Sequence, residues 1–472
     1  MIIKTVKPPL LLLCCLCLYG LMACTRSNPS GIDWWLTQTK DGSVLFEKQA
    51  SLNWTTHVAT DLPTVDIRDT QRYQAIDGFG FTLTGGSAHH LMGMSAKART
   101  ALLRELFATD GSHIGISYLR LSIGASDLNA FPFSYDDLPE GETDPEMELF
   151  DLGPDRKDVI PVLKEILAIN PAIRLMGSPW SPPKWMKTNN DTRGGSLKPE
   201  YYPAYAKYFV KYILQMQAEG IPIDAVTVQN EPLHPGNNPS LLMLAEEMAT
   251  FVKLHLGPAF EQAGITTKII VYDHNCDRPD YPISILDDPE AKKYVNGSAF
   301  HLYAGTIDAL STVHEQHPDK ELHFTEQWMG APGDLSTDMP YHIKHLTIGA
   351  TRNWSRTVLE WNLANGPDHK PHTDRGGCDR CLGGITISGD SVTRNPAYYV
   401  VAHSAKFVRP ESVRIASNEP IGLSNVAFCT PNGNIVLIVL NESGTSQTFQ
   451  VKNNNRQFTA MLQNGAVATY IF

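Results

Sequence analysis

The sequence predicts an α/β protein built on a (β/α)8 barrel, with a β-sandwich side domain formed from an N-terminal segment and the C-terminal strands. Two patterns predict the barrel: short continuous apolar runs recur along the chain, and amphipathic helical stretches lie between them. Such runs are typical of parallel strands covered on both faces, and eight strand–helix units close into a barrel. A third pattern predicts the side domain, because after about residue 405 apolar residues alternate and Gly and Asn turns separate the runs.

The chain begins with an export signal. Residues 1–23 have a basic start and an apolar stretch too short to be a convincing membrane span. The sequence LMAC at residues 21–24 resembles a bacterial lipobox, which predicts Cys24 as the lipidated first residue of the mature protein. The alternative is an ordinary cleaved secretory signal, which leaves the placement of Cys24 to coincidence. We expect an outer-membrane or cell-surface lipoprotein that contacts the membrane only through this lipid, with a periplasmic orientation as the alternative.

The mature chain divides into three predicted parts. Residues 24–75 are strand-like in places and are expected to pack with the C-terminal strands, residues 76–405 form the barrel, and residues 406–472 complete the β-sandwich. Helix candidates inside the barrel, such as 199–220 and 239–257, carry apolar residues three and four positions apart. The predicted barrel strands are 76–85, 117–124, 173–180, 225–232, 268–275, 298–303, 322–329 and 357–364.

Composition limits the classes of partner and of scaffold. The chain has a formal charge of −11, which argues against nucleic acid and other polyanions as partners. Its content of 42% hydrophobic and 19% charged residues is typical of a folded globular protein. Of the 8 Cys, four lie at or before Cys24, so a disulfide-dense scaffold is not expected. The sequence indicates no oligomeric state.

Two glutamates close predicted barrel strands. Glu231 follows the apolar run AVTVQN, and Glu326 ends the run LHFTE. In a barrel of this kind, active-site side chains lie at the C-terminal ends of the strands. Two carboxyl groups that face each other about 5 to 5.5 Å apart suit a retaining glycosidase. The alternative for either glutamate is a loop cap or an ion pair with an Arg.

A series of motifs, in order, resembles glycoside hydrolase family 30, the family of acid β-glucosidase (glucosylceramidase) and microbial endo-β-1,6-glucanases. The motifs include GFGFTLTGGSA, YLRLSIGASDL, SPWSPPKWMKTN, VTVQNEP, FTEQW and EWNLA, and they span nearly the whole mature chain. The resemblance implies a barrel with a β-sandwich side domain and a retaining mechanism. Carried to the matching positions, it makes Glu231 the acid/base and Glu326 the nucleophile.

Further residues are expected to complete the site. Asn230 is placed to hydrogen-bond the sugar 2-hydroxyl, and Arg120 is expected to hold Glu326 ionised. Tyr303 is expected to donate a hydrogen bond to the nucleophile, and His301 to line the sugar site. Each of these has the alternative of a satisfied core polar group. The remaining predicted sugar contacts are three rings that can stack on a sugar face, Trp180, Trp328 and Trp361, and Asp127, for which a turn role is the alternative.

One position departs from the family pattern. In glucosylceramidases an Asp after the first strand holds the outer hydroxyls of a terminal glucose, and here Gly85 stands at the matching place. Loss of that carboxylate is expected to open the space beyond O6, where a 1→6-linked chain leaves the site. We therefore predict an endo-β-1,6-glucanase with β-glucan as its partner. The alternatives are a glucosylceramidase or exo-β-glucosidase, and a non-catalytic carbohydrate-binding lipoprotein, against which the presence of both glutamates argues.

Cys378 and Cys381 form a CDRC motif after the eighth strand, downstream of His369 and His372. The spacing allows a zinc site if all four side chains converge tetrahedrally. In an exported protein, a loop disulfide or two free thiols is the preferred interpretation. Glycoside hydrolysis by two carboxylates requires no metal, so we expect neither a metal nor another cofactor.

Overall fold

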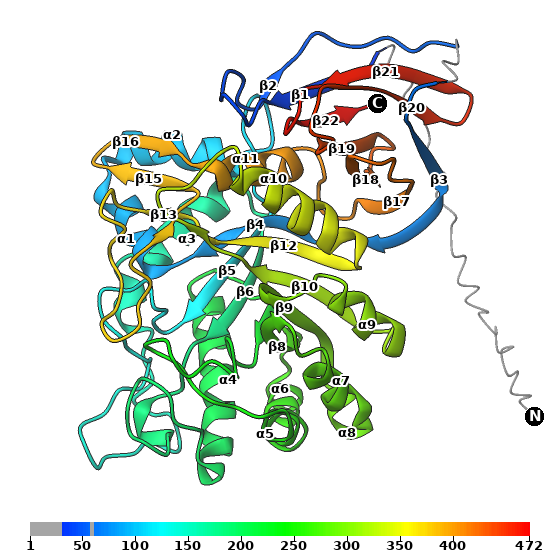
Figure 1. The fold of residues 1–472 in the computed structure, drawn as a ribbon. Helices are drawn as coiled ribbons and strands as arrows, with labels where there is room; N and C mark the ends of the chain where they lie inside the picture. Colours follow the sequence, from blue (N-terminus) through cyan, green and yellow to red (C-terminus); the bar gives the residue numbers. More distant parts are fainter. Residues whose placement is uncertain (1–30, 57–60) are drawn as a thin grey trace, which may run out of the picture.

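Eight parallel strands close into a barrel in the computed structural model, which describes residues 31–56 and 61–472 (Figure 1). Each strand pairs with its neighbours in the order β10-β12-β4-β5-β6-β7-β8-β9, and β9 returns to β10. The predicted barrel is confirmed. Its strands are β4 (Gly78–Leu83), β5 (Tyr118–Ile123), β6 (Arg174–Pro179), β7 (Ala225–Thr227), β8 (Lys268–Cys276), β9 (Val295–Gly305), β10 (Glu321–Glu326) and β12 (Ser355–Asn362).

Helices surround the barrel on its outer face (Figure 1). Most follow a barrel strand and return the chain to the start of the next one, as parallel pairing requires. The helices are α1 (Gly85–Gly93), α2 (Ala96–Phe107), α3 (Val159–Ile169), α4 (Tyr202–Ala218), α5 (Ala245–Phe251), α6 (Gly257–Ala263), α7 (Asp280–Asp287), α8 (Pro289–Lys292), α9 (Ala309–Gln316), α10 (Asp338–His342) and α11 (Pro396–Ala405), with π-helical segments at Val252–Leu256 and Ile343–Ala350.

Two predicted elements have different bounds in the structure. The helix expected at 239–257 begins only at Ala245, because the Glu247 carboxylate accepts a hydrogen bond from the Leu244 N–H and starts the helix there. The strand expected at 225–232 ends at Thr227. Beyond Thr227 the backbone bonds two other barrel strands. The Asn230 N–H donates to the Pro179 oxygen of β6, and the Glu231 N–H donates to the Asp273 backbone oxygen of β8.

The second unit is a nine-stranded sheet to which both ends of the described chain contribute. The expected pairing of the N-terminal segment with the C-terminal strands is present, because β1 pairs with β22, and β3 lies between β17 and β20. The sheet order is β2-β1-β22-β19-β18-β17-β3-β20-β21. Its strands are β1 (Asp33–Thr37), β2 (Glu47–Lys48), β3 (Thr64–Ala75), β17 (Val413–Ser417), β18 (Leu423–Cys429), β19 (Ile435–Asn441), β20 (Gln447–Asn453), β21 (Arg456–Leu462) and β22 (Val467–Ile471).

The central strand β19 explains how the two units join. All seven of its residues are buried. Val436, Ile438 and Leu440 belong to the core that the sheet shares with the barrel, whereas Ile435, Leu437 and Val439 belong to the core of the β-sandwich. Successive side chains of a strand point to opposite faces, so a continuous apolar run is required where both faces are covered.

A buried histidine adds a polar contact at this junction. His403 of α11 bonds the Thr37 hydroxyl through Nε2 and the Thr469 hydroxyl through Nδ1, both at 2.9 Å. Burial lowers the pKa of His403 to about 3, so the ring is neutral at physiological pH. Neutral imidazole has one donor and one acceptor nitrogen, and the two hydroxyls satisfy both.

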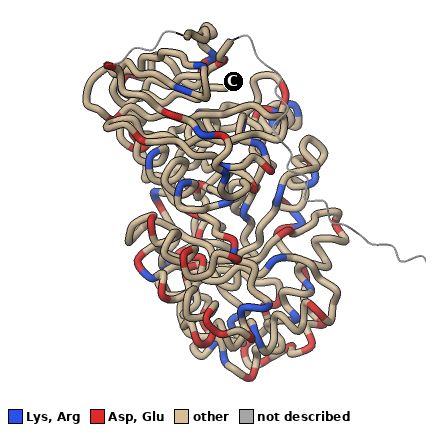
Figure 2. The backbone as a smooth tube through the Cα atoms, turned by 90° about the vertical axis from the view of Figure 1, so that its right-hand side faces the viewer, with Lys and Arg blue, Asp and Glu red and all other residues tan. Residues whose placement is uncertain are grey.

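The predicted signal at residues 1–23 and Cys24 lie outside the described residues. Within the described part, no helix has the length and apolarity needed to cross a membrane. Acidic and basic residues are interspersed along both units (Figure 2).

We expect Ile67→Ala to destabilise the protein by about 2–5 kcal/mol, the usual cost of removing a large aliphatic side chain from a core. Ile67 lies on β3, is 2% exposed, and packs in the β-sandwich core. Chemical denaturation monitored by circular dichroism measures the change. Arg68→Ala is the matched control, since the side chain of the next residue on the same strand is 69% exposed. Equal destabilisation by the two substitutions would contradict this account of the core.

Candidate active site

A cavity of about 460 Å³ lies at the carboxyl ends of the barrel strands. This volume suits a ligand of one or a few sugar units, and the position is where barrel enzymes place their active sites. Five of the predicted sugar-binding residues line it together with both glutamates. The lining residues are Asp127, Trp180, Glu231, His234, Asn237, His274, Asn275, Tyr303, Glu326, Trp328, Trp361, Cys378 and Cys381.

Glu326 is the last residue of β10 and is held by two donors. Arg120 Nη1 lies 2.6 Å from Oε2, and the Tyr303 hydroxyl donates to Oε1 at 2.9 Å. The structure therefore places both of the predicted contacts on this carboxylate. A cation and a hydroxyl that point at the two oxygens fix its orientation and stabilise its ionised form.

Glu231 lies four residues beyond β7, at a backbone φ of +43°. Residues other than glycine rarely adopt such a φ, and strain of this kind concentrates at functional sites. Its carboxylate accepts a hydrogen bond from Asn237 Nδ2 at 3.2 Å on Oε2. On the other side, His301 Nδ1 lies 3.3 Å and His274 Nδ1 3.8 Å from Oε1.

His301 lies between the two glutamates. Its Nδ1 is 3.3 Å from Glu231 Oε1 and 3.9 Å from Glu326 Oε1, so both carboxylates face one nitrogen atom at short range. Burial by itself lowers the pKa of His301, but the charge of Glu326 and hydrogen bonds with Asp273 and Glu231 raise it to about 9. The imidazole is therefore a cation at neutral pH. It lies beneath the carboxylates and does not line the cavity, contrary to the prediction that it would.

The surroundings of the two glutamates shift their pKa values in opposite directions. Burial raises the pKa of Glu326, and the neighbouring charge of Glu231 adds to this rise, although His301 and Arg120 act against it. Burial acts in the same direction on Glu231, but there the hydrogen bond and charge of His301 outweigh it and lower the pKa. Ionisation of either carboxyl opposes ionisation of the other, as expected for like charges that share a site.

Asp273, on β8, joins these groups and was missed in the sequence analysis. Its Oδ2 lies 2.7 Å from Arg120 Nη2, and its Oδ1 lies 3.2 Å from His301 Nε2. Burial raises its pKa, but Arg120, His301 and a hydrogen bond from Thr325 together lower it well below the usual value. The available signal was a carboxylate near the end of the buried run KIIVYDHN, the same signal that indicated Glu231 and Glu326.

Arg120 lies in the middle of β5, so its side chain occupies the barrel interior beneath the cavity. It is 0% exposed and also donates to Asn230 Oδ1 at 2.6 Å. Its guanidinium lies against the rings of Trp180 and Trp361, 4.7 and 5.9 Å from their centroids. Arg120 and Asn230 therefore support the site from below the residues that line it.

Asp127 is a third carboxylate at the cavity. Burial raises its pKa to about 7, and the charges of Glu326 and Glu231 add to the effect. The backbone N–H groups of Asp127 and Cys378 near the carboxyl act in the opposite direction. A carboxyl with this pKa is partly protonated near neutrality and can both donate and accept hydrogen bonds.

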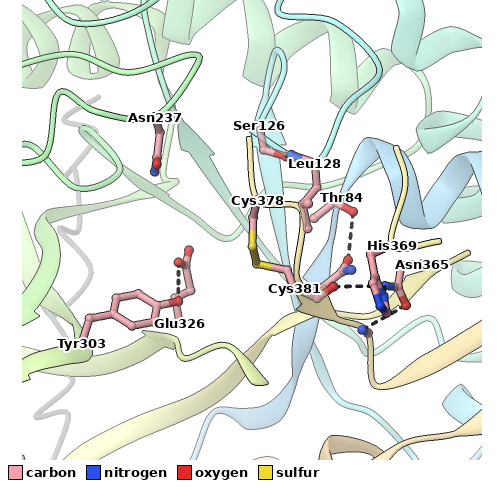
Figure 3. The surroundings of a disulfide bond; sticks show 12 residues. Thr84, Ser126, Leu128, Asn237, Tyr303, Glu326, Asn365, His369, Cys378 and Cys381 are labelled. Atoms are coloured by element: carbon pink, nitrogen blue, oxygen red, sulfur yellow. Dashed lines mark hydrogen bonds between the residues drawn. A yellow bond between two sulfur atoms is a disulfide. The ribbon is translucent and has the colours of Figure 1, made fainter. Parts of the chain in front are cut away.

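The predicted zinc alternative at Cys378 and Cys381 is wrong, because the two sulfurs form a disulfide (Figure 3). His369 bonds the Asn365 side chain, and His372 faces a backbone oxygen. A different set of groups, Glu231, His274 and His301, has ligand atoms within 4.8 Å of one another. The raised pKa of His301 opposes metal binding there, since a cationic imidazole has no lone pair to offer.

The expectation that Gly85 leaves an open space is also wrong. A Cβ at Gly85 would lie 2.0 Å from Asn129 Nδ2, so the Asn129 side chain already fills that position. Asn129 is held there because its Oδ1 accepts hydrogen bonds from the backbone and hydroxyl of Ser126. Gly85 begins α1 and is not among the residues that line the cavity.

Comparison with known proteins agrees with this geometry. Endo-1,6-beta-D-glucanase of Neurospora crassa is 33% identical over 86% of this chain and 87% of its own length. Lysosomal acid glucosylceramidase of Mus musculus is 28% identical over 86% of this chain and 82% of its own. The structure of the endo-beta1,6-glucanase BT3312 superposes with a TM-score of 0.87 at 35% identity and covers 93% of this chain and 99% of its own.

Family models match both units of the fold. Residues 76–408 match the glycosyl hydrolase family 30 TIM-barrel domain, and residues 411–470 match the glycosyl hydrolase family 30 beta sandwich domain. The two matches meet between α11 and β17, where the barrel gives way to the sheet. The chain is a glycoside hydrolase and belongs to glycosyl hydrolase family 30.

Proposed function

We propose that this protein is an endo-β-1,6-glucanase that hydrolyses β-1,6-glucan with retention of configuration. The observation that carries the proposal is the pair Glu231 and Glu326, which face one imidazole nitrogen inside a cavity of this family's barrel. The choice of substrate is supported by the relatives from Neurospora crassa and of known structure, both named as endo-1,6-glucanases.

In the first step, Glu326 Oε attacks the anomeric carbon while Glu231 gives its proton to the leaving glycosidic oxygen. The bond from the anomeric carbon to that oxygen breaks, and a glycosyl ester forms at Glu326. In the second step, Glu231 takes a proton from water, whose oxygen attacks the anomeric carbon and releases Glu326. The carbon is inverted twice, so the product keeps the β configuration.

The charges of the site support these roles once sugar is bound. In the free site the pKa of Glu326 is raised and that of Glu231 is lowered, whereas the first step needs a protonated Glu231 and an ionised Glu326. Positive charge develops at the anomeric carbon beside Glu326 in the transition state, which stabilises the anion there. Arg120 and Tyr303 act in the same direction, because both donate to Glu326.

We also propose that the protein is an exported lipoprotein anchored through Cys24. The proposal is supported by the basic and apolar segment at residues 1–23 and by the LMAC sequence at its end. A single N-terminal lipid-modified residue would keep the catalytic domain at a membrane surface, where it meets glucan from outside the cell or in the periplasm.

On β-1,6-glucan, we expect early release of oligosaccharides and a β-configured reducing end as the first product. Internal cleavage of a polymer yields oligosaccharides before monosaccharide, and double displacement yields the β anomer first. Chromatography of early products and time-resolved proton NMR measure the two outcomes. A β-1,3-glucan and glucosylceramide serve as comparison substrates. Preference for glucosylceramide would replace the proposed substrate, and an α anomer formed first would overturn the mechanism.

The two glutamates should fail differently when replaced by Ala. Glu231→Ala should lower kcat/KM on β-1,6-glucan by about 10²–10⁴-fold, the usual contribution of general acid–base catalysis. With an activated aryl β-glucoside and azide, this variant should form a β-glycosyl azide. Glu326→Ala should instead form an α-glycosyl azide, because azide replaces the missing nucleophile. The wild type with azide is the control, and exchanged product configurations would reverse the assigned roles.

Cys24→Ala should move the protein from the membrane fraction to the soluble fraction, because the substitution removes the residue that we propose carries the lipid anchor. Fractionation of expressing cells followed by immunoblotting measures the distribution. Cys17→Ala is the matched control, because Cys17 lies within the signal that processing would remove. If the Cys24 variant stays in the membrane fraction, the anchor proposal fails.

A further inference from the structure

The Cys378–Cys381 disulfide forms part of the wall of the catalytic cavity. Both cysteines line it, and Figure 3 shows the bridge between the Tyr303–Glu326 pair and Leu128. The sulfurs belong to an apolar cluster rather than to a surface loop. That cluster consists of Leu128, Trp180, Trp361 and Cys381, with Trp328 and Cys378 packed against it.

The loop that carries the bridge is held at both of its ends. On one side, the Arg375 guanidinium forms two hydrogen bonds of 2.9 Å with the Asp191 carboxylate. On the other side, β14 (Cys381–Leu382) pairs with β11 (Met329–Gly330), which follows Glu326 by only a few residues. The bridge spans the segment between these attachments, so it fixes the part of the loop that faces the cavity.

The same segment holds the third carboxylate of the site. The Thr373 N–H donates to the Asp127 backbone oxygen at 2.8 Å, and Cys378, Cys381 and the Asp127 side chain line the same cavity. Close packing makes this arrangement precise, because a Cβ at Gly377 would lie 2.2 Å from the Thr373 oxygen. A shift of this segment would therefore disturb the bond that Thr373 makes to Asp127 and move the wall beside the Asp127 carboxyl.

We propose that the Cys378–Cys381 bridge is a specificity-determining element of the cavity, which holds the Asp127 carboxylate and an apolar wall against one glucosyl unit of the substrate. The hydroxyl groups of that unit bond Asp127, and its C–H groups contact the sulfurs and Trp361. The bridge takes no part in bond breaking and acts through position. The inference rests on the proposed function only in that the substrate is a β-glucoside.

The test compares the oxidised protein, the protein reduced with tris(2-carboxyethyl)phosphine, and the double variant C378S/C381S. KM and kcat are measured on an aryl β-glucoside and on β-1,6-glucan, with thiol titration and circular dichroism on each sample. We expect reduction and the double variant each to raise KM about tenfold, with a smaller change in kcat and unchanged secondary structure. Reoxidation should restore KM in the wild type. The double variant should not respond to the reductant, which controls for effects elsewhere in the protein.

Asp127→Ala separates positioning from simple bracing of the loop. If the bridge acts through Asp127, breaking it in the Asp127→Ala protein should raise KM by less than twofold further, because the two changes remove one interaction. Full additivity of the two effects would overturn the proposal, as would a KM within twofold of wild type after reduction shown by thiol titration. If the double variant does not fold, the KM of the reduced wild type tests the proposal. If the bridge resists reduction, the KM of the double variant tests it. Hydrolysis of the aryl glucoside without cleavage of β-1,6-glucan would refute the proposed substrate while leaving this test intact.

Discussion

The buried ion pair between Arg120 and Asp273 is the constraint on which the active site depends. Both side chains are 0% exposed and lie 2.7 Å apart inside the barrel. A charge in that position without partners would cost several kcal/mol, so the structure must supply acceptors for Arg120 and donors for Asp273. The partners come from four other barrel strands, β6, β7, β9 and β10, or from the loop after β7, and satisfying one guanidinium and one carboxylate therefore fixes their relative positions. They are Ser178, Thr227, Asn230, His301, Thr325 and Glu326.

The backbone around this pair carries strain that the network supports. Glu231, Tyr272 and Asp273 have positive φ, and each such residue costs of the order of 1–3 kcal/mol. The Glu231 N–H donates to the Asp273 oxygen at 3.0 Å, so the strained segments hold each other. The Glu231 carboxylate therefore has a fixed orientation before substrate binds. Preorganised charges of this kind stabilise a transition state without the cost of reorganisation.

The rim above the network is assembled from several barrel loops. Lys187, which is completely buried, donates to the Ser181 hydroxyl and to the backbone oxygens of Thr192 and Ser240. The Asn238 side chain bonds Asp374, which joins the loop after β7 to the disulfide-bridged loop. Long loops tied in this way can keep a cavity in shape without regular secondary structure.

The sequence by itself determined the barrel, the side sheet and the two glutamates. Continuous apolar runs with helices between them admit few folds, and a carboxylate that closes such a run is conspicuous because burial of a charge is costly. Glu231 and Glu326 are the two carboxylates that this pattern indicated. The apolar run in β19 also predicts a strand. Only the structure reveals that the side chains on its two faces pack in two different hydrophobic cores.

Tertiary structure alone decided how the site is layered. Asn230 and His301 were expected to touch sugar, yet neither lines the cavity, because depth along a barrel strand depends on stagger between strands that the sequence does not record. The role of Asp273 could not be predicted either, because its partners are far away in sequence. The prediction from Gly85 failed because the Asn129 side chain, from another loop, fills the space beside Gly85. Residue types and their order are local information, whereas which side chain occupies a given volume is settled only when distant segments pack together.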